Sequence, residues 1–253
     1  MASKVIWLIA IVLEVVPLVR AMEAKFLRNY KFFYSYLGFV FARDLWLLAV
    51  YFLWPKLYTY AYWWSEPVGV LMGCWLVWEV YKIALARYPG TARMARNVLA
   101  FLFIVASSRI IVKAWNSPTW IPGRTLFEIE RDLRSVQLAL LIGLVALFTC
   151  YVIPLGRNLK GVAYGYALFL GTSVINLTLR DKLGYSFQHS WEYIQPICYL
   201  LVLGVWCLAL WSYAPIPQPP TEPRLEADYQ SLLVSTKETV RSARSYVVKA
   251  MRP

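Results

Sequence analysis

Histidine is almost absent from this sequence: His189 is the only one among 253 residues. A bis-histidine haem, a histidine-rich zinc site and a di-iron site with two Glu-x-x-His motifs each need several histidines, so the sequence excludes all three. A catalytic Ser–His pair is conceivable in principle, but the chain has no Gly-x-Ser-x-Gly motif and no serine obviously set against His189. We therefore interpret His189 as a surface residue.

Other residues that mark particular functions are missing too. The last apolar run, residues 191–213, contains no lysine, so a retinal Schiff base has no attachment point there. The cysteines all lie inside apolar runs and no pair has the spacing of a zinc or redox site, so we interpret them as small packing residues. They are Cys74, Cys150, Cys198 and Cys207. The sequence predicts no metal, no cofactor and no catalytic residue.

Charged residues are scarce, at 16% of the chain, whereas hydrophobic residues make up 60%. A soluble domain has about 25% charged and about 45–50% apolar residues. The apolar residues form runs that are each long enough for a helix to cross a bilayer, which takes about 20 residues. These runs lie at residues 5–20, 33–54, 65–86, 97–114, 135–154, 159–179 and 191–213. We predict an all-α polytopic membrane protein with a seven-transmembrane-helix bundle, since a soluble protein would have to bury every run in one core.

The basic residues predict the orientation of this bundle. The net charge is +12, and most Lys and Arg fall in the first, third and fifth connections and in the tail, whereas the second connection holds only Lys56. Because cytoplasmic loops are rich in Lys and Arg, the N-terminus is predicted outside and the C-terminus inside. This explains the charge without a nucleic-acid partner. Glu14 interrupts the first run and basic residues follow it, so we predict a retained helix and not a signal peptide.

The pattern divides the chain into a transmembrane domain at residues 1–214 and a proline-rich linker with a basic cytoplasmic tail at residues 215–253. Prolines at the density of the linker cannot continue a helix. In the tail, apolar residues recur at helical spacing between Lys and Arg, which suits an amphipathic helix on the inner leaflet; a disordered end is the alternative. The candidate lipid-surface residues are Arg241, Arg244 and Lys249.

Ionisable residues interrupt the first four runs. They are Glu14, Arg43, Asp44, Glu79 and Arg109. An ionisable group at membrane depth costs a few kcal/mol, so it normally faces another helix or a cavity and finds a partner. Consecutive helix residues diverge by about 100°, which predicts that Arg43 and Asp44 reach different neighbouring helices. Two interpretations stay open: an interhelical polar clamp, or a binding cavity or proton path built on the same residues.

The longest connection on the outer side runs from residue 115 to residue 134. Prolines and a glycine predict a turn-rich loop, and the segment after them has helical spacing. We predict that this segment lies along the membrane surface before the fifth run enters the bilayer. Its charges alternate in sign, which is typical of a solvated face; a ligand-contacting loop is the alternative. The candidate outer-loop site comprises Glu130, Arg131, Arg134 and Gln137.

The sixth run carries small residues at a spacing of four. Gly161 and Gly165 form one such pair, and Ala163 and Ala167 form the other. Small residues at this spacing let two helix backbones approach closely, so we predict a tight helix–helix contact here and no phosphate-binding loop.

Several stretches give the chain a family resemblance. They are Arg20-Ala21-Met22, Trp78-Glu79-Val80-Tyr81, the segment from Glu130 and Arg131 through Arg134 to Gln137, and Gly161 to Leu170. Over most of residues 1–215 the chain resembles an uncharacterised family of bacterial seven-transmembrane-helix proteins with no assigned activity. The resemblance implies this fold and a bacterial inner-membrane location, and it implies no catalytic residue.

These features are compatible with three functions. The first is a non-enzymatic sensor, receptor-like or scaffold protein, in which a cavity among the second to fifth runs binds a small or lipidic ligand and the basic inner face signals to a cytoplasmic protein partner. The second is a small-solute or proton-coupled transporter that uses the intramembrane charges as a relay. The third is a lipid-modifying enzyme, which is disfavoured because no nucleophile–base pair or metal motif is recognisable.

Overall fold

The computed structural model describes residues 2–23, 26–86, 88–116, 122–151, 155–183, 185–214 and 224–250. Within these ranges all regular elements are helical, which confirms the all-α prediction. The helices are α1 (Ala2–Glu23), α2 (Phe26–Asn29), α3 (Lys31–Leu53), the 3₁₀ turn η1 (Pro55–Leu57), α4 (Tyr58–Ala84), α5 (Pro89–Asn116), α6 (Pro122–Cys150), α7 (Arg157–Leu183), α8 (Tyr185–Ala209) and α9 (Arg224–Ala250).

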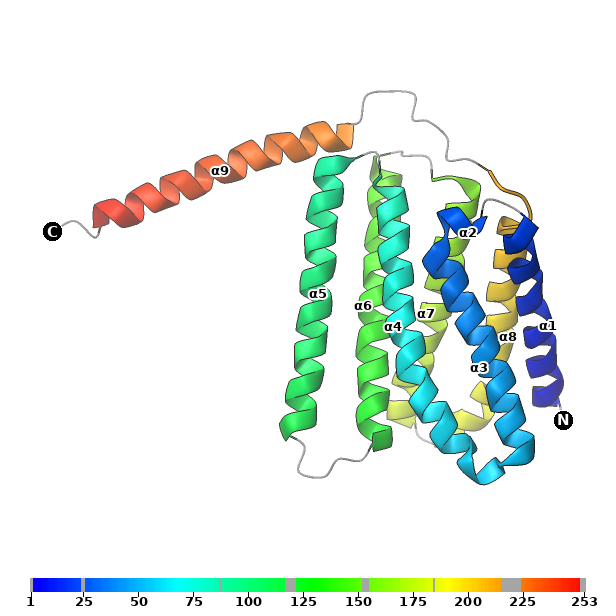
Figure 1. Ribbon diagram of the computed structural model, residues 1–253. Coiled ribbons are helices and arrows are strands. Elements are labelled where there is room, and N and C mark those ends of the chain that lie inside the picture. The colour runs from blue at the N-terminus through cyan, green and yellow to red at the C-terminus, as the bar shows by residue number, and fades with distance from the viewer. Residues whose placement is uncertain are drawn as a thin grey trace.

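The long helices α1 and α3 to α8 run side by side along a common axis (Figure 1). Successive long helices point in opposite directions, as helices joined by short connections do. The chain therefore starts at one end of the bundle and leaves α8 at the other end. Helix α9 extends away from the bundle at that second end (Figure 1).

The helices have the length and the surface of membrane spans. Within the described part of the chain, five ranges are long and apolar enough to cross a bilayer: Val5–Met22, Lys31–Leu53, Pro55–Ala84, Glu128–Cys150 and Arg157–Leu179. Helix α8 contains a shorter apolar stretch, Ile194–Ala209. Large apolar side chains on many helices are exposed, among them Val12, Phe52, Trp75, Ile104 and Leu208. Soluble monomers rarely expose extensive apolar patches, so the structure supports a multi-pass membrane protein.

Helix α6 begins earlier than the sequence predicts. The segment up to Gln137 is expected to lie along the membrane surface, but in the structure it forms the first turns of α6, which continues unbroken from Pro122 to Cys150. Arg134 is only 7% exposed and Gln137 is fully buried. The prediction of an outer-loop site is therefore wrong for these two residues. Their polar groups point into the bundle, where other helices supply the partners.

The tight contact predicted for the sixth run is confirmed between α7 and α8. A Cβ atom added at Gly161 would overlap the side chain of Ala209, and one added at Gly165 would overlap the indole of Trp206. The Trp206 ring is fully buried and packs edge-on against Phe33 of α3, with ring centroids 5.2 Å apart. The small residues of α7 thus leave room for a large ring that links α8 to the centre of the bundle.

A buried asparagine that the sequence analysis did not single out holds the end of α8. The Asn158 Nδ2 group of α7 donates hydrogen bonds to the carbonyls of Ala209 (2.7 Å) and Ser212 (2.9 Å). Its Oδ1 atom accepts a hydrogen bond from the backbone N–H of Ala214 (2.6 Å). The last carbonyls of a helix have no intrahelical partner, so this side chain supplies one and fixes where the chain leaves the bundle.

Candidate functional site

Five ionisable side chains from α3, α4 and α6 meet inside the bundle, and we call them the polar cluster. They are Arg43, Asp44, Glu66, Glu130 and Arg134. Arg43 Nη1 lies 2.9 Å from Glu66 Oε2, and Arg43 Nε lies 3.4 Å from Asp44 Oδ1. The long Arg43 side chain thus contacts its own neighbour as well as α4. The prediction that Arg43 and Asp44 reach different helices holds only in part, since Asp44 also accepts a hydrogen bond from Trp7 of α1.

Arg134 is the most deeply buried cation of the polar cluster. Its Nε atom lies 2.9 Å from Glu130 Oε1 one turn earlier in α6, and Nη2 forms an ion pair with Glu66. Nη1 donates a hydrogen bond to Ser173 Oγ of α7 (3.1 Å), and the guanidinium lies 4.9 Å from the centre of the Phe169 ring. A buried guanidinium without carboxylates would cost several kcal/mol, so these contacts determine how α4, α6 and α7 pack.

The charges of the polar cluster do not cancel. Two guanidinium groups face three carboxylates, which leaves a formal charge of −1 when all are ionised. Glu66 is paired with both Arg43 and Arg134, Glu130 is paired with Arg134, and Asp44 is paired with Arg43. The polar cluster therefore brings a net negative charge into the bundle.

A neutral hydrogen-bond network continues from the polar cluster along α6. Gln137 Nε2 donates to the carbonyl of Val70 (3.0 Å) and lies 3.0 Å from Cys74 Sγ, both in α4. Its Oε1 atom accepts a hydrogen bond from the hydroxyl of Tyr166 in α7 (2.9 Å). The Tyr166 hydroxyl fits against Gly73, where an added Cβ atom would overlap it. Gln137 therefore joins three helices at a point where α4 has no side chain.

Glu79 lies apart from the polar cluster. Its two carboxylate oxygens accept hydrogen bonds from the backbone N–H groups of Phe32 (3.0 Å) and Phe33 (2.8 Å), in the first turn of α3. These N–H groups have no partner within their own helix, and a negative charge there also faces the positive end of the helix dipole. For Glu79 the geometry matches the polar-clamp interpretation, because the residue ties α4 to the start of α3.

Glu14 lies on α1, which contributes no side chain to the polar cluster. Glu14 of α1 is fully buried and accepts a hydrogen bond from the hydroxyl of Tyr199 in α8 (2.6 Å). Arg109 belongs to α5, and its side chain lies outside the described residues. Arg131 forms an ion pair with Asp132, with 3.7 Å between Nε and Oδ1, and its side chain is 26% exposed. The polar cluster thus combines Arg43 and Asp44 of the predicted intramembrane group with Glu130 and Arg134 of the predicted outer-loop site.

The predicted lipid-surface residues lie in α9. Arg241 is exposed on this helix. The side chains of Arg244 and Lys249 lie outside the described residues, although both positions fall within the helix. His189 falls in α8, and its side chain also lies outside the described part of the chain.

Glu66 is the central residue that the sequence analysis missed. It accepts contacts from both arginines of the polar cluster and is 5% exposed. It stands one position inside the third apolar run, close to aromatic residues that mark an interface, so its sequence position does not distinguish it from a residue at the membrane surface. The signal that could have found it is Pro67: a proline inside a long apolar helix often marks a polar site where the backbone is interrupted.

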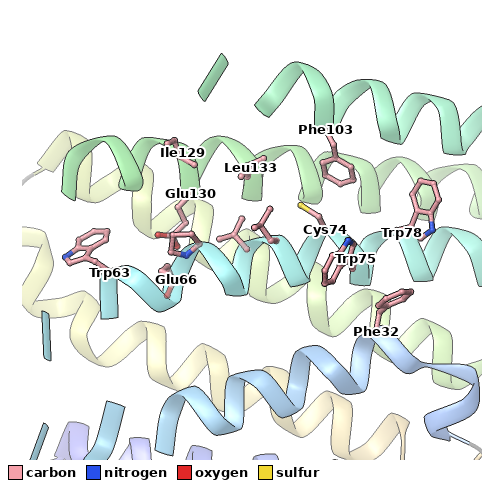
Figure 2. A pocket seen from close by; sticks show the side chains of 13 residues that line it. Phe32, Trp63, Glu66, Cys74, Trp75, Trp78, Phe103, Ile129, Glu130 and Leu133 are labelled. Atoms are coloured by element: carbon pink, nitrogen blue, oxygen red, sulfur yellow. The ribbon is translucent and has the colours of Figure 1, made fainter. Parts of the chain in front are cut away.

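A cavity of about 630 Å³ opens beside the polar cluster, among α3, α4, α5 and α6; we call it the aromatic groove. These helices correspond to the second to fifth runs, among which the sequence analysis predicts a cavity. Its lining residues are Phe32, Trp63, Glu66, Pro67, Val70, Leu71, Cys74, Trp75, Trp78, Phe103, Ile129, Glu130 and Leu133. Figure 2 shows Glu66 and Glu130 close together towards one end, near Trp63, and Trp78, Phe103 and Phe32 towards the other.

A second cavity of about 390 Å³ lies on the other side of the polar cluster, among α1, α3, α4, α6, α7 and α8; we call it the polar cavity. Arg43, Asp44 and Arg134 line it, together with polar groups of α7 and α8 such as Ser173 and Gln195. Glu66 and Glu130 line both cavities. The carboxylate pair therefore separates a mostly apolar compartment from a polar one.

The polar cluster supplies carboxylate and guanidinium groups that can form ion pairs and hydrogen bonds. Among the described residues, no group of three or more His, Cys, Asp or Glu side chains is arranged to hold a metal ion. No protein-family model, no curated protein and no solved structure matches this chain. The resemblance to a bacterial seven-helix family therefore stays a prediction, and the function has to be argued from the two cavities and the polar cluster.

Proposed function

We propose that this protein is a seven-transmembrane-helix sensor or receptor that binds a small or lipidic ligand in the aromatic groove. The observation that carries this proposal is the junction of the groove with the polar cluster at Glu66 and Glu130. Binding sites are typically concave, mostly apolar and about 300–1,000 Å³ in volume, with a few polar groups that orient the ligand. A purely structural ion cluster would not require an apolar cavity beside its carboxylates.

The proposed topology has the N-terminus outside and the C-terminus in the cytoplasm of a bacterial inner membrane. The bundle end from which the chain leaves α8 also carries Arg28 in α2, Lys31 at the start of α3, Lys82 at the end of α4, and Lys160 at the start of α7. The opposite end carries Lys56 in η1 and, in α5 to α7, Lys113, Arg124, Arg180 and Lys182, which acidic residues such as Glu128 and Asp181 offset. Clustering of basic residues at one end supports a cytoplasmic location for that end.

Cysteine labelling tests this topology. In a variant without native cysteines, Lys56→Cys is expected to react with a membrane-impermeant maleimide in intact spheroplasts, because it lies at the outer end. Lys160→Cys, which is exposed at the basic end, is expected to react only after permeabilisation. Labelling of Lys160→Cys from outside, with Lys56→Cys reacting only after permeabilisation, would overturn the orientation. Labelling of both sites from outside would overturn an odd number of membrane crossings between them.

Helix α9 supports a membrane-surface role for the tail. It has basic residues between apolar ones over Arg224–Ala250, and Figure 1 shows that it runs roughly across the axis of the bundle. Anionic lipids attract each nearby base by about 1 kcal/mol, so Arg241, Arg244 and Lys249 would hold the helix on the inner leaflet. In that position α9 would offer the proposed cytoplasmic partner a binding surface that is covalently linked to the bundle.

Ligand binding can be tested on the protein extracted from its own membranes. We expect native mass spectrometry in a mild detergent to show one bound small molecule or lipid. The variant Cys74→Phe, which fills the middle of the groove, is expected to lose this species (Figure 2). The variant Cys150→Phe is the matched control because Cys150 is exposed at the end of α6. Equal retention by both variants, with both still folded, would contradict binding in the aromatic groove.

A proton-coupled transporter is the alternative, and the carboxylates of the polar cluster favour it, because Glu66 and Glu130 line both cavities. Carboxyl groups inside a membrane protein can form part of a proton relay. This function predicts proton flux in proteoliposomes that Glu130→Gln or Asp44→Asn abolishes. Glu79→Gln is expected to leave the flux unchanged, since Glu79 caps α3. An ion-tight wild-type protein would rule out the relay and favour the receptor.

A further inference from the structure

We infer that the occupant of the aromatic groove is a lipophilic cation: an alkyl or aryl body that carries an ammonium group, with the ammonium at Glu66 and Glu130. This inference rests on the proposed function, because it specifies the ligand class of the same site. It follows from the sign of the charge that the groove presents, from the nature of the surrounding rings and from the side on which the groove opens.

The charge on the groove is negative. Among the described residues, Glu66 and Glu130 are its charged lining residues, and no lysine or arginine lines it. The two arginines of the polar cluster line the polar cavity instead, and they pair with Glu66 and Glu130 from that side. An anionic head in the groove would therefore meet the carboxylates before the guanidinium groups. An ammonium group would instead offset the formal charge of −1 on the polar cluster.

Two further groups favour a cation at this end of the groove. The Trp63 ring lies near the carboxylates in Figure 2, and the face of a tryptophan attracts ammonium groups. Pro67 has no N–H group, so the backbone carbonyl of Trp63 lacks its usual intrahelical donor. A carbonyl oxygen and an aromatic face both interact favourably with a desolvated cation.

The rest of the groove suits an apolar body that arrives from the bilayer. Trp75, Trp78, Phe103 and Phe32 gather at the end away from Glu130 (Figure 2). Leu71 and Trp75 line the groove and are nevertheless 58% and 57% exposed on the outside of the bundle. The groove is therefore accessible from the side that faces lipid, which admits an amphiphile with its head towards Glu66 and its tail along α4.

Photolabelling in nanodiscs tests the inference. Three probes share one alkyl chain with a diazirine near its tail and differ in the head: primary ammonium, hydroxyl or sulfonate. We expect the ammonium probe to label the α4 segment around Trp75 and Trp78 about tenfold more than the other two, as a charged hydrogen-bond partner implies. Glu130→Gln should lower this labelling about tenfold, whereas Glu128→Gln, two positions away in α6, should leave it unchanged.

A second pair of variants keeps the test decisive if Glu130→Gln does not fold. Trp63→Leu is expected to lower labelling by the ammonium probe several-fold, while Trp64→Leu, at the neighbouring position that is 75% exposed, should not. Equal labelling by all three probes would overturn the cation inference and leave ligand binding in the groove intact. Failure of every probe to label α4 would overturn both.

The natural source of the cation is resolved by changing the lipid. An amine-headed phospholipid in the nanodisc competes with the ammonium probe if the natural occupant is a membrane lipid, so labelling falls relative to phosphatidylglycerol nanodiscs, whose head group contains no ammonium. Unchanged labelling identifies a free lipophilic amine as the occupant. Either result is consistent with an ammonium site, provided that the head-group preference is present.

Discussion

Replacing Arg134 with leucine is expected to destabilise the folded protein by about 3–5 kcal/mol, the cost of leaving the partners of a buried ion pair without their cation. Arg134 is 7% exposed, and its guanidinium contacts Glu66, Glu130 and Ser173 on three different helices. The substitution replaces the guanidinium group with an apolar side chain of moderate size and leaves the carboxylates as excess negative charge inside the bundle. Thermal unfolding in detergent and the yield of monodisperse protein measure the effect.

The control for this substitution is Arg131→Leu, three positions earlier on the same helix. Arg131 is partly exposed, so its replacement should change the unfolding free energy by no more than about 0.5 kcal/mol. The double variant Arg134→Leu with Glu130→Leu removes a cation and a carboxylate together, and replacement of a buried pair by apolar groups is often nearly neutral. Recovery of most of the lost stability in the double variant is therefore expected. A single variant as stable as the wild type would contradict the structural role of the cluster.

The second large effect is expected at Gly73, where even one added methyl group collides with a hydroxyl. Gly73→Ala places a Cβ atom on the Tyr166 oxygen, which cannot move without losing its hydrogen bond to Gln137. Overpacking of this kind costs about 1–3 kcal/mol. Tyr166→Phe removes the oxygen and costs about 1 kcal/mol for the lost hydrogen bond. In the double variant the methyl group has room, so we expect a favourable coupling of about 0.5–3 kcal/mol.

A glycine elsewhere in the same bundle provides the control for that cycle. Gly171 in α7 has no atom within 4 Å of the position that a Cβ would occupy. Gly171→Ala is therefore expected to be neutral or to stabilise the helix slightly, since glycine is a poor helix former. Additive effects of Gly73→Ala and Tyr166→Phe in thermal unfolding would show that α4 and α7 do not meet at this hydroxyl.

The helices and their packing faces were predictable because both depend on local sequence. A run of apolar residues specifies a helix in a membrane whatever the rest of the chain does, and Gly161 and Gly165 mark a close contact by their size alone. The spacing of these glycines does not tell which helix packs against them. That Trp206 of α8 does so depends on how α8 is rotated about its own axis. That rotation is set by the whole bundle.

The polar cluster was predicted only in part, because ion pairs between helices are not local. Arg43 and Asp44 stand out in the middle of an apolar run, whereas Glu130 and Arg134 sit in a segment of alternating charges that resembles a solvated face. Their burial depends on Glu66, a residue more than sixty positions away from Arg134 along the chain. Conversely, Glu79 resembles a member of the cluster by sequence, but the start of α3 lies within reach and takes its carboxylate.

Because Glu66 and Glu130 line both the aromatic groove and the polar cavity, the two compartments obey thermodynamic linkage. A molecule that contacts these carboxylates from the groove alters the field at Arg43 and Arg134, and so alters the affinity of the polar cavity for whatever enters it. The coupling free energy is the same in both directions, whichever compartment fills first. A solute that binds in one compartment would therefore change the affinity of the other without any movement of a helix.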